Sequence, residues 1–448
     1  MKEFATSIVR TLRQSGFQAY LVGGCVRDLL LGRQPKDYDV ATNATPGQVM
    51  SIFPQTYAVG AQFGVVLVPA PQDEKAEGNA SGGHAHEVEV ATFRSDIGYT
   101  DGRHPDEVRF SDDPREDVVR RDFTINGMLL DPLSGQVLDF VGGEEDLKAG
   151  IIRAIGDPRR RFAEDKLRML RTVRFAARFA YTIESDTFAA IRKQAAEIGV
   201  VSRERVRDEL TRMLTEEHPH RAFLLLDESG LLREVLPEIS AMKRVEQPPQ
   251  FHPEGDVFTH TLLLLDHLPQ PCPPALAWGA LLHDVGKPPT FRVAPDRIRF
   301  DNHVEVGVKM AEEICRRLRF SSGDKEQILA LVDNHMRFGH VSRMKDSTLK
   351  KFMRMPRFDE HMALHRADSL ASHGNLATYE FLRKKLTEIP PETMRPLPLI
   401  NGDDLIAAGH APGPKFREIL ETVEDGQLEG RLPSREAALD FVRREFPV

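Results

Sequence analysis

The sequence changes character near residue 150. Before that point, short segments rich in β-branched and aromatic residues alternate with turn residues, which is typical of strands. After it, apolar residues recur at helical spacing, as in Leu167, Leu170 and Val173. The pattern predicts an α+β fold, with a mixed or antiparallel sheet and helices at the N-terminus followed by helical regions. The predicted strands span residues 20–22, 57–59, 64–68, 88–93 and 136–140.

Proline-bearing stretches divide the predicted helical part. They lie near residues 250 and 390, and proline ends helices and stiffens connections. A length of 448 residues also exceeds what one hydrophobic core usually supports. The sequence therefore predicts an α+β head followed by a helical neck and body, a further helical domain and a helical tail. These regions span residues 1–150, 151–250, 251–390 and 391–448.

The balance of charge indicates a globular protein with a local cationic patch. Hydrophobic residues make up 41% of the chain and charged residues 29%, as in soluble globular domains. A formal net charge of -8 argues against a uniformly basic nucleic-acid-binding surface. Residues 153–178 nevertheless hold eight arginines and one lysine against three acids. A phosphate-binding surface and a solvated helix face both fit this segment.

Neither export nor membrane insertion is expected. Residues 1–17 have helical apolar spacing broken by charges, unlike a signal peptide. The apolar runs are far shorter than the roughly 20 residues that span a bilayer. Cys25, Cys272 and Cys315 lie far apart and lack CxxC spacing, which favours a reducing compartment. We therefore expect a cytoplasmic protein with no membrane partner.

Two glycines and two aspartates in the head suit phosphate chemistry. Gly23 and Gly24 follow the first predicted strand, and backbone N–H groups at such a turn can approach phosphate oxygens. Asp37 and Asp39 flank Tyr38 in a predicted strand, where residues two apart point to the same side. Such a carboxylate pair can hold two Mg²⁺ ions. An ordinary tight turn and a surface turn are the alternatives.

Three ordered motifs carry a family resemblance. They are residues 23–39, residues 120–128 (Arg-Arg-Asp-Phe-Thr-Ile-Asn-Gly-Met) and residues 164–175. In this order they resemble the motifs of class II tRNA nucleotidyltransferases, the family of CCA-adding enzymes, which share their head with bacterial poly(A) polymerases. Gly127 departs from the more common alanine, a small-for-small change.

The resemblance implies template-independent addition of C and A to tRNA 3′ ends, with tRNA, ATP and CTP as partners. The terminal hydroxyl would attack the α-phosphate of the nucleotide, with Mg²⁺ held by Asp37 and Asp39. Glu89, on a neighbouring predicted strand, is a third candidate carboxylate, although an exposed strand residue would look the same. The residues implied to bind the nucleotide are Gly23, Gly24, Arg27, Arg121, Asp122, Asn126, Asp165, Arg168, Arg171 and Arg174.

The roles within this set differ. The resemblance assigns the triphosphate to the Gly23–Gly24 turn with Arg27, and the ribose to Arg121 and Asp122. If residues 164–175 form one helix, Asp165 and Arg168 face the same side and can imitate a Watson–Crick partner. Two further arginines of this set, one turn on, suit phosphates. The alternative is a surface salt bridge on an amphipathic helix.

Two further segments of the head lie between predicted strands. The polar stretch 69–86 suits a surface excursion. Residues 101–106, with glycine and proline, resemble the loop that helps such enzymes change from C to A addition, which argues against an enzyme that adds only CC. A full CCA-adding enzyme and an A-adding one both fit. Poly(A) polymerase is the next alternative, followed by a phosphohydrolase with an RNA-binding head.

A second chemistry is indicated within residues 251–390. Imidazoles and carboxylates from separate helices bind divalent transition metals, and the His283-Asp284 dipeptide resembles the signature of HD phosphohydrolases. The resemblance implies phosphodiesterase or phosphatase activity on 2′,3′-cyclic or terminal phosphates, with Lys287 near the phosphate; a structural role for the histidines is the alternative. The candidate ligands are His260, His283, Asp284, His303, His335 and Asp368.

Overall fold

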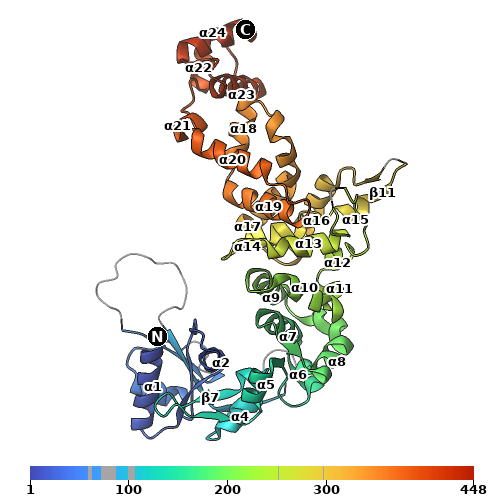
Figure 1. Cartoon of the computed structure of the whole chain (residues 1–448). Coiled ribbons are helices and arrows are strands. Elements are labelled where there is room, and N and C mark those ends of the chain that lie inside the picture. Colours follow the sequence, from blue (N-terminus) through green and yellow to red (C-terminus); the bar gives the residue numbers. More distant parts are fainter. Residues whose placement is uncertain (59–62, 72–86, 99–105, 251, 296) are drawn as a thin grey trace. The chain divides into compact units, whose positions relative to one another are not determined.

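The computed structural model describes the chain except for residues 59–62, 72–86, 99–105, 251 and 296 (Figure 1). Most of the predicted excursion 69–86 and of the loop 101–106 therefore lies outside the described residues. The chain forms two compact units, Met1–Pro237 and Glu238–Val448. Within the described residues, no helix is long and apolar enough to cross a membrane.

The first unit contains a six-stranded mixed sheet, as predicted. Its strand order is β3-β4-β2-β1-β7-β8. Neighbouring strands are antiparallel except β2 and β4, which run parallel and place Asp39 opposite Glu89. The strands are β1 (Ala19–Val22), β2 (Asp39–Thr42), β3 (Val65–Pro69), β4 (Glu87–Thr92), β7 (Met128–Leu130) and β8 (Val137–Asp139).

Four of the five predicted strands are confirmed to within two residues, as β1, β3, β4 and β8. In the fifth segment, Tyr57 forms an isolated bridge with Leu67. The strand predicted around Tyr38 begins only at Asp39, as β2, and the prediction missed β7. Asp37 was predicted on a strand but lies in the bend before β2, so that part of the prediction is wrong.

Helices pack against this sheet and bury its core. The apolar face of α1 (Lys2–Gln14) buries Ile8, Val9 and Leu12 against β1 and β2. The other helices of the head are α2 (Gly24–Leu30), α3 (Pro46–Ile52), α4 (Pro114–Val119) and α5 (Gly143–Ala149). A separate hairpin joins β5 (Arg94–Ile97) to β6 (Glu107–Phe110).

The chain becomes helical after β9 (Ile151–Ile152), which pairs with β10 (Thr182–Ile183). The helices that follow in this unit are α6 (Pro158–Glu164), α7 (Leu167–Arg178), α8 (Ser185–Gln194), α9 (Arg203–Thr215), α10 (Pro219–Glu228) and α11 (Leu231–Val235). The chain does not form one helix over residues 164–175. It breaks at Asp165 and Lys166, because the Asp165 carboxylate accepts the backbone N–H of Leu167 at 3.0 Å and starts α7 anew.

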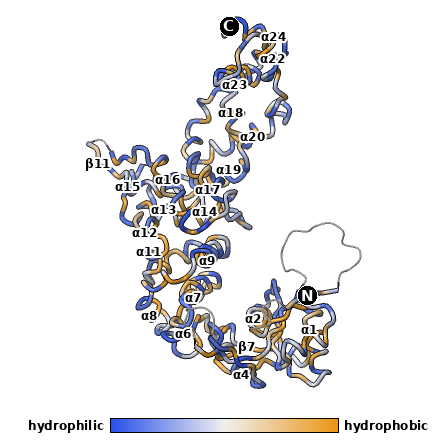
Figure 2. Tube along the Cα trace, turned by 180° about the vertical axis from the view of Figure 1, so that it is seen from behind, coloured by the Kyte–Doolittle hydropathy of each residue, from blue (hydrophilic) through white to orange (hydrophobic). Residues whose placement is uncertain are grey.

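The second unit is mainly helical, and hydrophobic and hydrophilic residues alternate along the helices of both units (Figure 2). Every residue of α14 except Pro274 is buried, with Trp278 fully enclosed. A small hairpin joins β11 (Arg292–Val293) to β12 (Ile298–Arg299). The longer helices are α13 (Val257–Asp266), α14 (Pro274–Leu282), α16 (His303–Arg317), α17 (Ser322–Asn334), α18 (Asp346–Met353), α19 (Phe358–Ala371), α20 (Ala377–Glu388), α23 (Pro414–Leu428) and α24 (Arg435–Glu445).

Candidate functional site

Three carboxylates gather at the start of β2. Asp39 opens the strand opposite Glu89 of β4, and Asp37 lies two residues earlier. Burial, the charge of Glu89 and that of Asp37 raise the pKa of Asp39 to about 6, although Arg121 acts in the opposite direction. A site with this excess of negative charge favours a bound cation. Asp37, Asp39 and Glu89 are therefore the residues here that could hold a divalent cation.

The turn between β1 and α2 passes close to these carboxylates. Gly23 has a positive φ of 79°, which favours glycine. A Cβ added there would lie 3.3 Å from Nη1 of Arg121 and 3.7 Å from Oδ2 of Asp39. Gly24 then opens α2. The glycine pair thus leaves room for other atoms between the backbone, Arg121 and Asp39.

A buried carboxylate that the sequence analysis did not identify holds Arg121. Asp117 of α4 is fully buried and accepts hydrogen bonds from Arg121 and Arg120 at 2.9 and 2.6 Å. Burial opposes the charge of Asp117, but the two arginines outweigh it and hold its pKa below the ordinary value. The guanidinium of Arg121 is therefore fixed beside Gly23 before any nucleotide binds.

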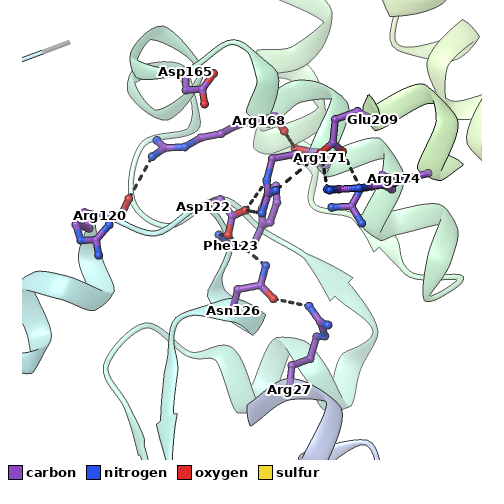
Figure 3. A network of polar contacts seen from close by, with 12 residues as sticks. Arg27, Arg120, Asp122, Phe123, Asn126, Asp165, Arg168, Arg171, Arg174 and Glu209 are labelled. Atoms are coloured by element: carbon purple, nitrogen blue, oxygen red, sulfur yellow. Dashed lines mark hydrogen bonds and ion pairs between the residues drawn. The ribbon is translucent and has the colours of Figure 1, made fainter. Parts of the chain in front are cut away.

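A chain of polar contacts connects the second motif with α2 and α7 (Figure 3). Asp122 Oδ2 accepts two hydrogen bonds from Arg171, at 3.0 and 2.7 Å. Its Oδ1 accepts one from Asn126 Nδ2 at 3.2 Å, and Asn126 Oδ1 accepts one from Arg27 Nη1 at 2.7 Å. Arg27 is only 4% exposed and also donates to Asp28. Four predicted nucleotide-binding residues thus hold one another in place.

Arg174 points away from this series of polar contacts and packs between helices. It is buried, its Nε donates to Glu209 Oε2 of α9 at 2.7 Å, and its Nη1 lies 3.3 Å from Glu216. Arg171 approaches the same Glu209, with 3.9 Å between Nη1 and Oε1. The expectation that Arg174 suits a phosphate is not supported by this placement, because its charge is already balanced by two carboxylates.

The two predicted base-reading residues are each held by a different neighbour; both are labelled in Figure 3. Asp165, just after α6, accepts a hydrogen bond from Arg205 of α9 at 2.7 Å. Arg168, in the first turn of α7, donates to Glu164 Oε2 at 2.8 Å and to the carbonyl of Arg120 at 3.2 Å. These partners therefore restrict both side chains.

The six predicted metal ligands of the second unit converge. His260 lies on α13, His303 on α16 and Asp368 on α19, while the others follow directly after α14 and α17. Two groups form, and the ligand atoms within each group lie within 4.8 Å of one another. The first contains His260, His283 and Asp368, and the second Asp284, His303 and His335.

Asp284 lies between the two groups. Its Oδ2 is 3.1 Å from His283 Nε2. Its Oδ1 is 3.8 Å from His303 Nε2 and 3.7 Å from His335 Nε2. Burial disfavours the charge of Asp284, but the surrounding histidines and Lys287 hold its pKa well below the ordinary value. One carboxylate oxygen thus faces each group, as in a bridging ligand.

Three of the histidines are oriented by backbone carbonyls. Nδ1 of His283, His303 and His335 lies 2.6–2.8 Å from the carbonyl oxygen three residues earlier, which places the ring proton on Nδ1. Their Nε2 atoms are buried; those of His303 and His335 have no hydrogen-bond partner among the described residues, and that of His283 faces Asp284 Oδ2 at 3.1 Å. Burial lowers the pKa of His335 to about 4, so its ring is neutral. Buried nitrogens on rings with fixed tautomers are what a transition-metal site requires.

An open cavity of about 470 Å³ borders the histidine cluster. His303 and His335 line it, together with Lys287, Arg299 and Phe300. Lys287 Nζ also lies 2.7 Å from Asp284 Oδ2. The cavity is thus lined both by candidate metal ligands and by cationic side chains, a combination that suits a phosphoester.

Comparison with known proteins identifies the family. The chain matches the poly A polymerase head domain over residues 19–153, the probable RNA- and SrmB-binding site of polymerase A over 180–243, and the HD domain over 256–372. It is 31% identical to a CCA-adding enzyme from Geobacillus sp. over 442 residues, covering 96% of this chain and 93% of that one. The chain belongs to the CCA-adding enzyme family.

Other CCA-adding enzymes match over shorter stretches. Those from Lactobacillus helveticus and Oceanobacillus iheyensis are 38% and 43% identical, over 58% and 49% of this chain. These alignments span 62% and 51% of the two relatives, so the chain spans only half to three-fifths of their length.

Solved structures of CCA-adding enzymes share the fold. The Bacillus stearothermophilus enzyme in complex with CTP has a TM-score of 0.74 at 27% identity, covering 98% of this chain and 97% of that one. The Thermotoga maritima enzyme complexed with tRNA has a TM-score of 0.59 at 19% identity, covering 99% and 94%, and shows similarity of fold alone.

Four residues that contact predicted site residues of this CCA-adding enzyme family member were not identified from the sequence. Asp117 is three and four residues before the arginines it binds, so helical spacing could have indicated it. Arg205 and Glu209 lie 35 to 40 residues from their partners, and no local pattern connects them. Glu254, which contacts His260, lies in a turn segment without periodicity.

Proposed function

We propose that the chain adds C and A to the 3′ end of tRNA, using CTP and ATP without a nucleic-acid template. The gathering of Asp37, Asp39 and Glu89 beside the Gly23–Gly24 turn carries this proposal. The solved relatives complexed with CTP, ATP and tRNA support it. In the reaction, the tRNA 3′-hydroxyl attacks the α-phosphate and pyrophosphate leaves.

The carboxylate group would hold Mg²⁺, which when bound activates the attacking hydroxyl and stabilises the leaving pyrophosphate. The residues around it have separate tasks. The backbone of Gly23 and Gly24 approaches the triphosphate, beside the guanidinium of Arg121. Asp122 accepts the ribose hydroxyl, in an orientation that Arg171 and Asn126 fix.

Base selection falls to Asp165 and Arg168. The carboxylate presents acceptors and the guanidinium presents donors, which together match the Watson–Crick edge of cytosine or adenine. The hydrogen bonds of Arg168 to Glu164 and of Asp165 to Arg205, which restrict the two side chains, support this role. In this proposal, residues 1–150 perform the chemistry, residues 151–250 select the base and bind RNA in the cytoplasm, and residues 391–448 form a tail.

Asp37→Ala tests the role of the carboxylates. Every addition should fall by at least about a thousandfold, because a lost metal ligand removes several kcal/mol of charge stabilisation, while tRNA binding in a filter assay stays near that of the parent. Turnover at the parent rate would contradict the proposal.

Asp165→Ala should instead relax the choice between CTP and ATP, measured as the ratio of kcat/KM values.

We further propose that the HD domain is a metal-dependent phosphodiesterase or phosphatase. The buried, unpartnered Nε2 atoms around Asp284 carry this proposal. The six ligands would hold one or two divalent transition metals, which when bound supply a hydroxide nucleophile for a 2′,3′-cyclic or terminal phosphate. Metal content should fall in His283→Ala, and unchanged content by elemental analysis would contradict it.

A further inference from the structure

We propose that Glu254 is a positioning residue of the histidine cluster, which orients His260 so that its Nε2 faces the metal. The inference rests on the proposed metal binding by that cluster. Glu254 lies in the turn segment before α13, and its side chain is only 7% exposed. Its Oε1 is 2.6 Å from Nδ1 of His260.

The three possible ligand groups in this region cannot all hold a metal. His260 belongs to two of them through different nitrogens. Its Nε2 lies 3.1 Å from Asp368 Oδ1 in the group with His283, whereas its Nδ1 contacts Glu254 in a third group with His252. A neutral imidazole has one lone pair and one N–H, so it can ligate through one nitrogen only.

The other histidines show which nitrogen that is. His283, His303 and His335 each direct Nδ1 to a backbone carbonyl and Nε2 towards Asp284. Glu254 occupies at His260 the place that a carbonyl oxygen occupies at the other three. Glu254 is therefore an acceptor for the Nδ1 proton. Glu254 and His252 do not ligate the metal themselves but support His260, which ligates with His283 and Asp368.

A carboxylate is a stronger acceptor than a carbonyl. A hydrogen bond to an ionised group is shorter and stronger than a neutral one, and an acceptor on the far nitrogen makes a ligating imidazole more basic. His260 thus differs from the other three histidines, because a full negative charge supports its ring. We expect this ring to contribute strongly to metal affinity in the group that contains His283 and Asp368.

The local backbone explains how Glu254 reaches His260. Gly255 has a φ of 129°, a conformation that suits glycine, and it turns the chain back towards the helix. Asp256 then caps α13 by accepting the backbone N–H of Thr259 at 2.8 Å. Glu254 Oε1 also lies 2.9 Å from Nδ1 of His252, a residue of the cavity wall. The contacts of Glu254 with His252 and of Asp256 with Thr259 therefore hold the turn in place.

The test is Co²⁺ binding to the full chain, followed by visible absorption in competition with a chelator. We expect Glu254→Ala to bind the ion 10- to 100-fold more weakly, the usual effect of losing such a support, with a shifted ligand-field spectrum. Glu254→Gln keeps an acceptor oxygen and should recover part of the affinity. Glu246→Gln, at a nearby exposed position, is the matched control and should behave as the parent.

Two outcomes overturn the proposal in distinguishable ways. If His260→Ala weakens Co²⁺ binding but Glu254→Ala retains the parent affinity and spectrum, Glu254 does not position the ring. If His260→Ala also binds as tightly as the parent, the proposed metal site itself fails. Circular dichroism and CCA addition by the same preparations establish that each variant is folded.

Discussion

The proposed nucleotide site of the first unit and the histidine cluster of the second unit differ in how their buried polar groups are paired. Around Asp122, arginines and carboxylates satisfy one another. Around Asp284, the Nε2 atoms of His303 and His335 have no hydrogen-bond partner among the described residues, and those of His260 and His283 lie 3.1 Å from carboxylate oxygens of Asp368 and Asp284. The comparison teaches that satisfied networks hold side chains in place, whereas buried imidazole nitrogens with an open lone pair suit a metal ligand.

The largest expected effect separates function from stability in the first unit. Asp39→Asn should reduce addition by at least about a thousandfold, because a metal ligand is lost. It should also raise the free energy of unfolding at pH 7 by on the order of 1 kcal/mol, because burial and Glu89 disfavour the charge of Asp39. Glu3→Ala, on the exposed side of α1, is the control. Loss of both activity and stability would contradict this account of the carboxylates.

A satisfied network should be costly to break. Glu209→Ala removes one of the two counter-charges of buried Arg174, and because Glu216 remains, the expected destabilisation is about 1–3 kcal/mol. Hydrogen exchange of amides in α7 and α9 measures it. Exposed Asp208, on the same helix, provides a matched alanine control with little effect. Equal protection in the two variants would mean that the ion pairs around Glu209 do not hold the helices together.

The histidine cluster should instead gain stability from an added ion. Co²⁺ at 100 times its Kd should raise the free energy of unfolding of the second unit by about 2.7 kcal/mol. Trp278, the only tryptophan of the chain, lies on α14 just before His283 and reports this unfolding by fluorescence. His283→Ala should show no such gain. A gain of the same size in that variant would place the ion elsewhere.

The smallest expected effect is a pH dependence of addition. The pKa of Asp39 is raised from 3.8 to about 6, so the carboxylate protonates as pH falls through 6 and metal affinity falls with it. The rate at subsaturating Mg²⁺ should drop about tenfold per pH unit below that point. The linked stability has the opposite sign, because the folded state binds the proton more tightly and gains stability as pH falls from 6 towards 4. A rate that is flat between pH 7 and 5 would contradict the raised pKa.

Sequence predicted the local parts of this molecule better than the partnerships between distant parts. Segments rich in β-branched and aromatic residues, bounded by turn residues, correctly located β1, β3, β4 and β8, because this composition is read within a few residues. The apolar spacing of Leu167, Leu170 and Val173 correctly indicated α7. One helix over residues 164–175 does not form, because the Asp165 carboxylate accepts the backbone N–H of Leu167 and the chain breaks there.

The sites show the same division. The motifs named the six histidine-cluster residues and the chain from Arg27 to Arg171 by residue type and order. They did not name Glu209, Arg205 or Glu254, which are single charged residues whose partners become neighbours only through packing. For such residues the deciding information is burial and distance, which a single sequence does not carry.

The most direct test of the central claim is an addition assay with the purified chain and three tRNAs, which end before the CCA, after the first C and after CC. CTP and ATP are supplied separately and together, and product lengths are read at single-nucleotide resolution. The account predicts that both nucleotides together complete all three tRNAs and that synthesis stops after CCA. Addition of A to the CC-ended tRNA alone, or long heterogeneous A tails, would contradict it.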